Sequence, residues 1–330
     1  MNDISLIPLH PWLIAPRERL AAAIQQDRLP HALLLSGPPG VGKGAFAREI
    51  ARALLCEHPT EDAAPCRQCT ECARVESGAH PDLFTVQPEE DSRVIKVDQV
   101  RDLSEKLSLS SHRGGYKVAI LDPAESMNIN AANSLLKTLE EPSDNTVCVL
   151  VCVNPAQLPA TIRSRCQQIR IGVPETAVAL RWLTAAAAVA ETPEMYLQLA
   201  GGAPLRAQQL AQTDIIEARQ ACFSALVGIL DGRTEPLAVA QEWAKNEQLR
   251  GIDWMREWIM DLLRIRMSGQ AEGVRSADIA EKLPALARKL DSRALFRQLD
   301  RINRIMKLSA SSLNRELLTE DILLAWAEQR

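Results

Sequence analysis

The 330-residue chain has few aromatic side chains, no long apolar run and no excess of positive charge. Aromatic residues make up 4% of the chain and the formal net charge is -4, so its surface as a whole does not attract a nucleic-acid backbone. Any contact with DNA must then be local or shared with partners. No span of about 18 apolar residues and no start resembling a signal peptide is found, which predicts a soluble cytoplasmic chain. Its length and 46% hydrophobic content favour two or three domains.

A glycine-rich motif also lacks one expected residue. Residues 37–44 read Gly-Pro-Pro-Gly-Val-Gly-Lys-Gly, a phosphate-binding P-loop in which Gly44 stands where a Ser or Thr hydroxyl should ligate Mg²⁺. An apolar strand-like run, 32–35, precedes the loop and a helical pattern, 45–55, follows it. This order favours a nucleotide-binding fold with a damaged metal site over a chance glycine turn.

The second half of a hydrolytic site is also incomplete. A strand-like run, 116–121, leads into Asp122, but Pro123 follows where a Glu would orient the attacking water. Glu125 would have to reach back around a turn that begins with a proline, so we expect it to be a solvated loop residue. Binding of nucleotide without turnover is the resulting prediction.

Arg165 is a candidate for action on a neighbouring molecule. Ser164-Arg165-Cys166 lies between a strand-loop-helix stretch, 147–162, and another strand-like run, 167–171. An arginine inserted into a neighbour's site stabilises charge on a transferring phosphoryl group. The residues alone leave an ordinary surface cation as the alternative.

Four motifs together resemble those of bacterial clamp-loader AAA+ subunits. They are the P-loop, His80-Pro81-Asp82, the run Asn-Ser-Leu-Leu-Lys-Thr-Leu-Glu-Glu-Pro at 133–142, and Ser164-Arg165-Cys166. The resemblance is strong over residues 1–210, and the remainder is similar in helical character and length. Within that family, the absences at Gly44 and Pro123 fit the stator subunit better than the motor subunit.

The resemblance implies a place in a hetero-pentamer with gamma/tau and delta subunits, which loads a sliding clamp onto primer-template DNA for a DNA-directed DNA polymerase. Arg165 is then an arginine finger acting in trans, and this chain itself is not expected to hydrolyse ATP. Arg206 lies where the family carries a second sensor arginine, although a solvated helix arginine is an equal alternative. The candidates for contact with ATP or ADP are Gly37, Gly40, Gly42, Lys43, Gly44, Asp122 and Arg206.

Four cysteines form a separate motif with the spacing C-x₉-C-x₂-C-x₂-C: Cys56, Cys66, Cys69 and Cys72. Two C-x₂-C pairs that share a thiolate suit tetrahedral Zn²⁺, and a full set of four ligands indicates a structural rather than a catalytic ion. His58 and His80 are expected to be loop residues. The remaining cysteines lie among apolar residues and are expected to be buried: Cys148, Cys152, Cys166 and Cys222.

The order of elements predicts an α/β P-loop AAA+ domain with an inserted zinc module, a small helical lid and an all-helical collar. We expect these domains at 1–172, with the module at 56–72, at 173–211 and at 212–330. Short strands are predicted at 83–86 and 94–97, a helix from Asp98, a helix capped by Asn130, and a buried strand at 146–153. Asn154 is expected to be a turn residue rather than a phosphate sensor. Four tryptophans of the last domain are expected in cores or interfaces: Trp243, Trp254, Trp258 and Trp326.

Two other hypotheses remain open. An active AAA+ motor would need Glu125 or a water to replace the missing groups, and it predicts Mg²⁺-dependent turnover by the chain alone. A zinc-dependent nucleic-acid-binding module predicts salt-sensitive DNA binding that is lost when zinc is removed.

Overall fold

The computed structural model describes residues 9–90, 92–185, 192–245, 250–270, 273–308 and 314–329. The chain divides into two compact units, residues 1–182 with 203–206, and residues 183–202 with 207–330. No helix among the described residues is long and apolar enough to cross a membrane.

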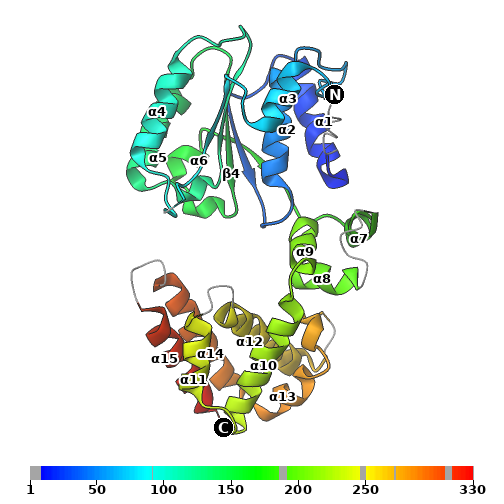
Figure 1. Cartoon of the computed structure of the whole chain (residues 1–330), viewed down its shortest axis with the longest axis vertical. Coiled ribbons are helices and arrows are strands. Elements are labelled where there is room, and N and C mark those ends of the chain that lie inside the picture. The colour runs from blue at the N-terminus through cyan, green and yellow to red at the C-terminus, as the bar shows by residue number, and fades with distance from the viewer. Residues whose placement is uncertain are drawn as a thin grey trace. The chain divides into compact units, whose positions relative to one another are not determined.

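The first unit is built on a parallel sheet with strand order β2-β3-β4-β1-β5. Its strands are β1 (Ala32–Ser36), β2 (Leu83–Val86), β3 (Lys117–Leu121), β4 (Thr146–Cys152) and β5 (Gln167–Arg170). Its helices are α1 (Ile14–Gln25), α2 (Lys43–Leu55), α3 (Thr70–Ser77), α4 (Val97–Ser108), α5 (Ile129–Glu140) and α6 (Ala160–Arg163). Figure 1 shows α4, α5 and α6 on one side of the sheet and α1, α2 and α3 on the other. The predicted α/β fold with a parallel sheet is confirmed.

Alternation along the strands divides the core between the two faces of the sheet. In β1, Leu33 and Leu35 point to the core that α1 and α2 cover, whereas Leu34 points to the core under α4 and α5. All five residues of β1 are buried, as expected for a central parallel strand covered on both faces. The P-loop therefore leaves the sheet from a strand that is buried along its whole length.

Two local predictions were wrong. Residues 94–97 do not form a strand: Ile95 makes an isolated bridge to Met127, because its backbone bonds to the loop residues Ser126 and Asn128. Helix α5 is capped by Asn128 and not by Asn130, since the Asn128 Oδ1 accepts the Ala131 N–H at 2.8 Å. The first error arose because a single bridge buries Ile95, and the second because two asparagines lie close together at the start of α5.

The second unit is helical. It contains α8 (Pro193–Leu199), α10 (Ile215–Leu230), α11 (Pro236–Lys245), α12 (Gly251–Ser268), α13 (Leu283–Lys289), α14 (Ser292–Leu308) and α15 (Arg315–Ala327). Helices α7 (Thr176–Ala185) and α9 (Pro204–Ala211) each have residues in both units. The expected short helices of 175–211 and the following helical bundle are confirmed. The predicted tryptophans are all buried in one core: Trp243, Trp254, Trp258 and Trp326.

Candidate functional site

The P-loop connects β1 to α2, and its glycines are required by its shape. Gly40 and Gly42 have φ of 79° and 89°, in the left-handed region. A Cβ on Gly37 would lie 1.9 Å from the Ile171 carbonyl oxygen, so no side chain fits there. The predicted glycine loop therefore forms where the sequence placed it, at the start of a helix.

Lys43 is the first residue of α2 and is buried. Its Nζ donates to the carbonyl oxygens of Gly37 and Pro38, each at 2.8 Å. Burial lowers the pKa of Lys43, and the carboxylates of Asp122 and Glu125 oppose that shift. The ammonium is thus satisfied by its own loop, and a phosphate bound here would have to take the place of those carbonyls.

Gly44 faces Asp122. A Cβ on Gly44 would lie 2.9 Å from the Asp122 Oδ2, which is too close for a side chain, so the carboxylate takes up space that a Ser or Thr at position 44 would need. Burial raises the pKa of Asp122, while the charges of Lys43 and Arg48 lower it. The arrangement can hold a phosphate through Lys43 and the loop amides, but it offers a metal one oxygen fewer than a complete P-loop does.

Glu125 is not the solvated loop residue that the sequence predicted. It is half-buried, its Oε1 accepts the Val153 N–H at 2.7 Å, and its Oε2 is buried without a hydrogen-bond partner in the described part of the chain. The carboxylate is therefore bound to the end of β4. Asn154 is a turn residue, as expected, because its Oδ1 accepts the Ala156 N–H at 3.0 Å.

Arg206 lies beside the P-loop. The Leu205 N–H donates to the Gly40 carbonyl at 3.0 Å, and a Cβ on Gly40 would lie 2.5 Å from the Arg206 Cβ. The first turn of α9 thus packs directly on the phosphate-binding loop, although the two segments are distant along the chain.

An aromatic cluster that the sequence did not predict also covers the P-loop. The Trp12 Nε1 donates to the Val41 carbonyl at 2.8 Å, and His10 stacks on Trp12 with ring centroids 4.9 Å apart. Trp182 meets both rings edge-on, at 5.1 Å from His10 and 5.4 Å from Trp12. These contacts hold the segment before α1 against the loop.

The buried imidazole of His10 should make the first unit less stable in mild acid. Burial lowers the pKa of His10 from its ordinary value of 6.5, so its stabilising contribution is present above that value and is lost as the pH falls through the folded pKa. Thermal unfolding of the wild type and of His10→Phe at pH 7.5 and 5.5 tests this. We expect the wild type to lose more of its Tm on acidification than the variant, which keeps a ring in the stack; equal losses would show that His10 does not contribute.

Arg165 is bound by residues of its own unit. Its Nη2 lies 2.6 Å from the Glu140 Oε1, its Nη1 donates to the Thr161 carbonyl at 2.9 Å, and the side chain is 35% exposed. In the part of the chain that the structure describes, these are its polar side-chain contacts, and neither partner belongs to the P-loop. The guanidinium is therefore at the surface and is not part of this chain's own phosphate site.

The predicted cysteine ligands come together. The sulfur atoms of Cys56, Cys66, Cys69 and Cys72 all lie within 4.8 Å of one another. Two of the Sγ–Sγ distances are 3.9 Å (Cys56–Cys69) and 4.0 Å (Cys66–Cys72), close to the edge of about 3.8 Å of a tetrahedron with Zn–S bonds of about 2.3 Å. The donor set and its size therefore fit a tetrahedral metal ion.

Backbone amides donate to three of the four sulfurs, although burial still raises the pKa of the Cys56 and Cys72 thiols. The N–H groups of Cys66, Cys69 and Cys72 donate to the Sγ of Cys56, Cys66 and Cys69 at 3.3, 3.4 and 3.4 Å. Although burial acts in the opposite direction, the N–H groups of Gln68 and Cys69 lower the pKa of the Cys66 thiol to about 6. Such amide donors orient thiolates around a metal.

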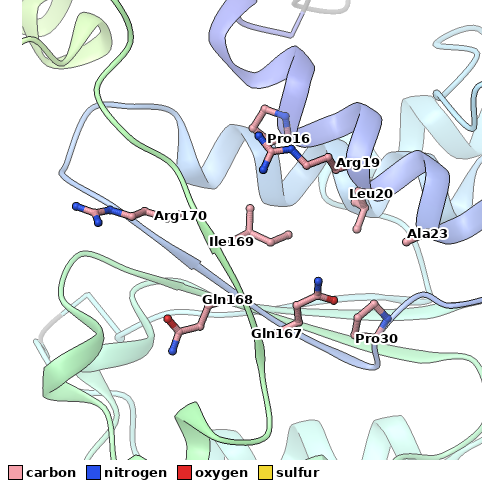
Figure 2. A pocket seen from close by; sticks show the side chains of 9 residues that line it. All are labelled: Pro16, Arg19, Leu20, Ala23, Pro30, Gln167, Gln168, Ile169 and Arg170. Carbon is pink, nitrogen blue, oxygen red and sulfur yellow. The ribbon is translucent and has the colours of Figure 1, made fainter.

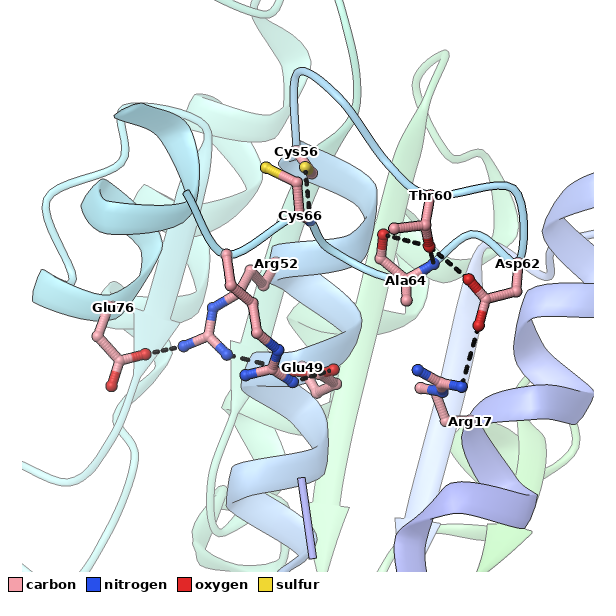
Figure 3. Close-up of polar contacts among 10 residues, drawn as sticks. Arg17, Glu49, Arg52, Cys56, Thr60, Asp62, Ala64, Cys66 and Glu76 are labelled. Atoms are coloured by element: carbon pink, nitrogen blue, oxygen red, sulfur yellow. Dashed lines mark hydrogen bonds and ion pairs between the residues drawn. The ribbon is translucent and has the colours of Figure 1, made fainter. Parts of the chain in front are cut away.

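Two charged clusters join this cysteine module to the rest of the first unit. In the first, shown in Figure 3, Glu49 of α2 binds Arg52 at 3.1 Å and Arg67 at 2.7 Å, and Arg52 also pairs with Glu76 of α3. Glu49 and Arg52 are buried. The module is therefore fixed to the helix that begins at Lys43.

The second cluster gives the His-Pro-Asp stretch a role. The His80 Nε2 lies 3.1 Å from the Glu71 Oε2 in α3, and the Asp82 N–H donates to the His80 Nδ1 at 3.0 Å. The Asp82 carboxylate accepts the N–H groups of His112 and Arg113 at 2.8 and 3.1 Å. His80 is thus a buried connector between α3 and β2 and not a fifth metal ligand.

A pocket of about 240 Å³ lies between α1 and the edge strand β5. Figure 2 shows Arg19, Gln168 and Arg170 among the side chains around it. Lys43, Asp122 and Arg165 are absent from its walls, so it is separate from the P-loop.

Comparisons with known proteins place the chain in a family. The model for the delta subunit of DNA polymerase III matches residues 15–175, and the model for the C-terminal part of that delta subunit matches residues 213–328. The delta-prime subunit of DNA polymerase III from Pseudomonas aeruginosa is 37% identical over 97% of both chains. The chain belongs to the DNA polymerase III delta-prime family. The delta-prime subunit of Escherichia coli K12 is 34% identical, over 96% of this chain and 94% of its own.

The tau subunit of the same polymerase is also similar. That of Escherichia coli K12 is 31% identical over 82% of this chain but only 46% of its own length. The match to delta-prime runs from end to end, whereas the match to tau leaves more than half of that protein uncovered. The AAA+-like P-loop fold is thus shared, and the family membership follows the delta-prime relatives.

Proposed function

We propose that the chain is the stator of a bacterial clamp loader, which binds but does not hydrolyse nucleotide and supplies Arg165 to the ATP site of a neighbouring subunit. The observation that carries this proposal is the juxtaposition of Gly44 with Asp122. The position that should provide the second metal oxygen faces the carboxylate and has no side chain. Family membership supplies the setting, since the full-length relatives are delta-prime subunits.

The proposed partners follow from membership of the delta-prime family. Gamma/tau and delta subunits would complete a hetero-pentamer that acts on a sliding clamp and primer-template DNA in the cytoplasm. In this arrangement residues 1–172 would form the nucleotide-binding-like domain, 173–211 the lid and 212–330 the collar. The net charge of -4 supports contact with DNA through the assembly rather than by this chain alone.

The site residues divide into three groups. Lys43, the loop glycines and Arg206 would hold the phosphates of ATP or ADP, with Asp122 beside them. Cys56, Cys66, Cys69 and Cys72 would hold Zn²⁺, which supplies a closed tetrahedral crosslink and no reaction step. Arg165 would act on the phosphate of the adjacent subunit, because a guanidinium can bind two phosphoryl oxygens at once.

ATP turnover by the purified chain, with Mg²⁺ and primed DNA, tests the proposal. We expect no turnover above background for the wild type or for Lys43→Ala. We also expect that omission of this chain from a reconstituted loader abolishes clamp loading. Turnover that disappears in Lys43→Ala would make the chain a motor subunit and overturn the proposal.

A parallel DNA-binding assay tests the alternative hypothesis that the chain is a zinc-dependent nucleic-acid-binding module. The isolated chain should not show DNA binding that weakens with salt and is lost on treatment with a zinc chelator. If it does, the cysteine module is a nucleic-acid-binding element in its own right.

A further inference from the structure

Arg165 is held by one contact that is distant in sequence and by one local contact. Its partner Glu140 is the last residue of α5, and Thr161, whose carbonyl accepts from it, lies in α6. The two contacts, at 2.6 and 2.9 Å, use different nitrogens of the guanidinium. They therefore fix its plane and do not merely neutralise its charge.

The contacts leave most of the guanidinium available. An arginine side chain has five N–H donors, of which one goes to Glu140 and one to Thr161. With 35% of the Arg165 side chain exposed, the remaining donors are open to a ligand from outside the chain. A phosphate could thus be bound while both internal contacts persist.

This pair is suited to positioning rather than to stability. The Glu140 side chain is 49% exposed, and solvent screening makes such an ion pair contribute little to folding. A flexible arginine loses conformational freedom when it enters a neighbour's site, and a side chain held in one orientation beforehand loses less. The Glu140–Arg165 ion pair would therefore increase the rate of ATP hydrolysis in the adjacent subunit rather than the stability of this chain.

We propose that Glu140 is a positioning residue, which together with the Thr161 carbonyl presents Arg165 to the nucleotide of the adjacent subunit. The inference rests on the proposed role of Arg165. Glu141 provides a matched control, because it is the next residue, carries the same charge and has no ion pair in the described part of the chain. If only charge near the interface matters, Glu140 and Glu141 should be equivalent.

The test is single-turnover ATP hydrolysis by the reconstituted loader with sliding clamp and primed DNA, which resolves the ATP site that this chain is proposed to face. The loaders contain wild-type chain, Glu140→Gln, Glu141→Gln, Arg165→Ala, or Glu140→Gln with Arg165→Ala. We expect Glu140→Gln to lower the hydrolysis rate constant at that site about two- to fivefold with an unchanged affinity for ATP, and Glu141→Gln to match the wild type. In the Arg165→Ala background, Glu140→Gln should have no further effect, because the residue acts through the arginine.

Three results would overturn the inference. One is a wild-type rate constant at that site for Glu140→Gln, another is a rise in that rate constant, and the third is a loss that persists in the Arg165→Ala background. An Arg165→Ala loader with no slow site would instead remove the finger role itself and the inference with it. Thermal unfolding of the isolated variants serves as the folding control, and Glu140→Gln should melt within about 2 °C of the wild type.

Discussion

Replacement of Arg165 by Ala should severely reduce ATP hydrolysis at one site of the assembled clamp loader while the chain itself remains folded. An arginine finger supplied in trans is worth about 10³- to 10⁵-fold in kcat at the site it enters. We therefore expect at least about a 10³-fold loss at the one ATP site that faces this chain, and a smaller fall in the total ATPase of a loader whose other sites remain intact. Single-turnover hydrolysis, in which the affected site becomes a separate slow phase, measures this directly.

Two controls make the result specific to the guanidinium. Arg165→Lys keeps the positive charge but loses the planar fork, so it should recover little of the activity. Arg170→Ala removes an exposed arginine from the neighbouring strand β5, and hydrolysis by this variant should show no slow phase. If Arg165→Ala and Arg170→Ala gave the same kinetics, Arg165 would be an ordinary surface cation.

The elements of the first unit could be predicted because their signals are local. A buried parallel strand is a continuous apolar run, and the helix over residues 97–108 shows its apolar face through Val100, Leu103 and Leu107, all of which are buried. The prediction of a strand at 94–97 was wrong because an apolar residue can be buried without belonging to a strand. Ile95 is buried and makes only a single bridge between two loops. Periodicity in so short a run does not distinguish the two structures.

A site could be predicted from the sequence only where all of its contacting residues lie within one short motif. The P-loop and the four cysteines are short motifs, and each folds on itself. The contacts between Glu140 and Arg165, and between His10 and Trp182, join positions whose pairing no local pattern shows. The His-Pro-Asp stretch was a visible signal, but its meaning depended on Glu71 in the cysteine module.

The position of the cysteine module would give a metal bound there an influence beyond its own loop. Glu49 and Arg52 belong to the same helix as Lys43, and both are buried against the module. A buried ion pair that loses one partner typically costs about 3–5 kcal/mol, because an uncompensated charge remains. Unfolding of residues 56–78 would remove Arg67 and Glu76 from this network and leave Glu49 and Arg52 paired only with each other.

Removal of the metal should therefore destabilise the whole first unit. Cys72→Ser replaces a fully buried sulfur ligand, and we expect zinc content to fall from about one equivalent to near zero. The Tm of the first unit should fall by about 10 °C or more, because several kcal/mol of metal binding and of buried ion pairing are lost together. Elemental analysis and thermal unfolding measure the two effects, and a strong chelator should reproduce both in the wild type.

Cys222→Ala distinguishes loss of a ligand from loss of a buried thiol. Cys222 is buried in the helical unit, away from the cluster, so its replacement should leave the zinc content unchanged. Hydrogen exchange adds a spatial criterion: in Cys72→Ser, protection should be lost first in α3 and in the loop before it, and then in α2, because Glu49 and Arg52 connect them. Full zinc content in Cys72→Ser, or unchanged protection of α2 after zinc is lost, would show that the module does not brace the P-loop helix.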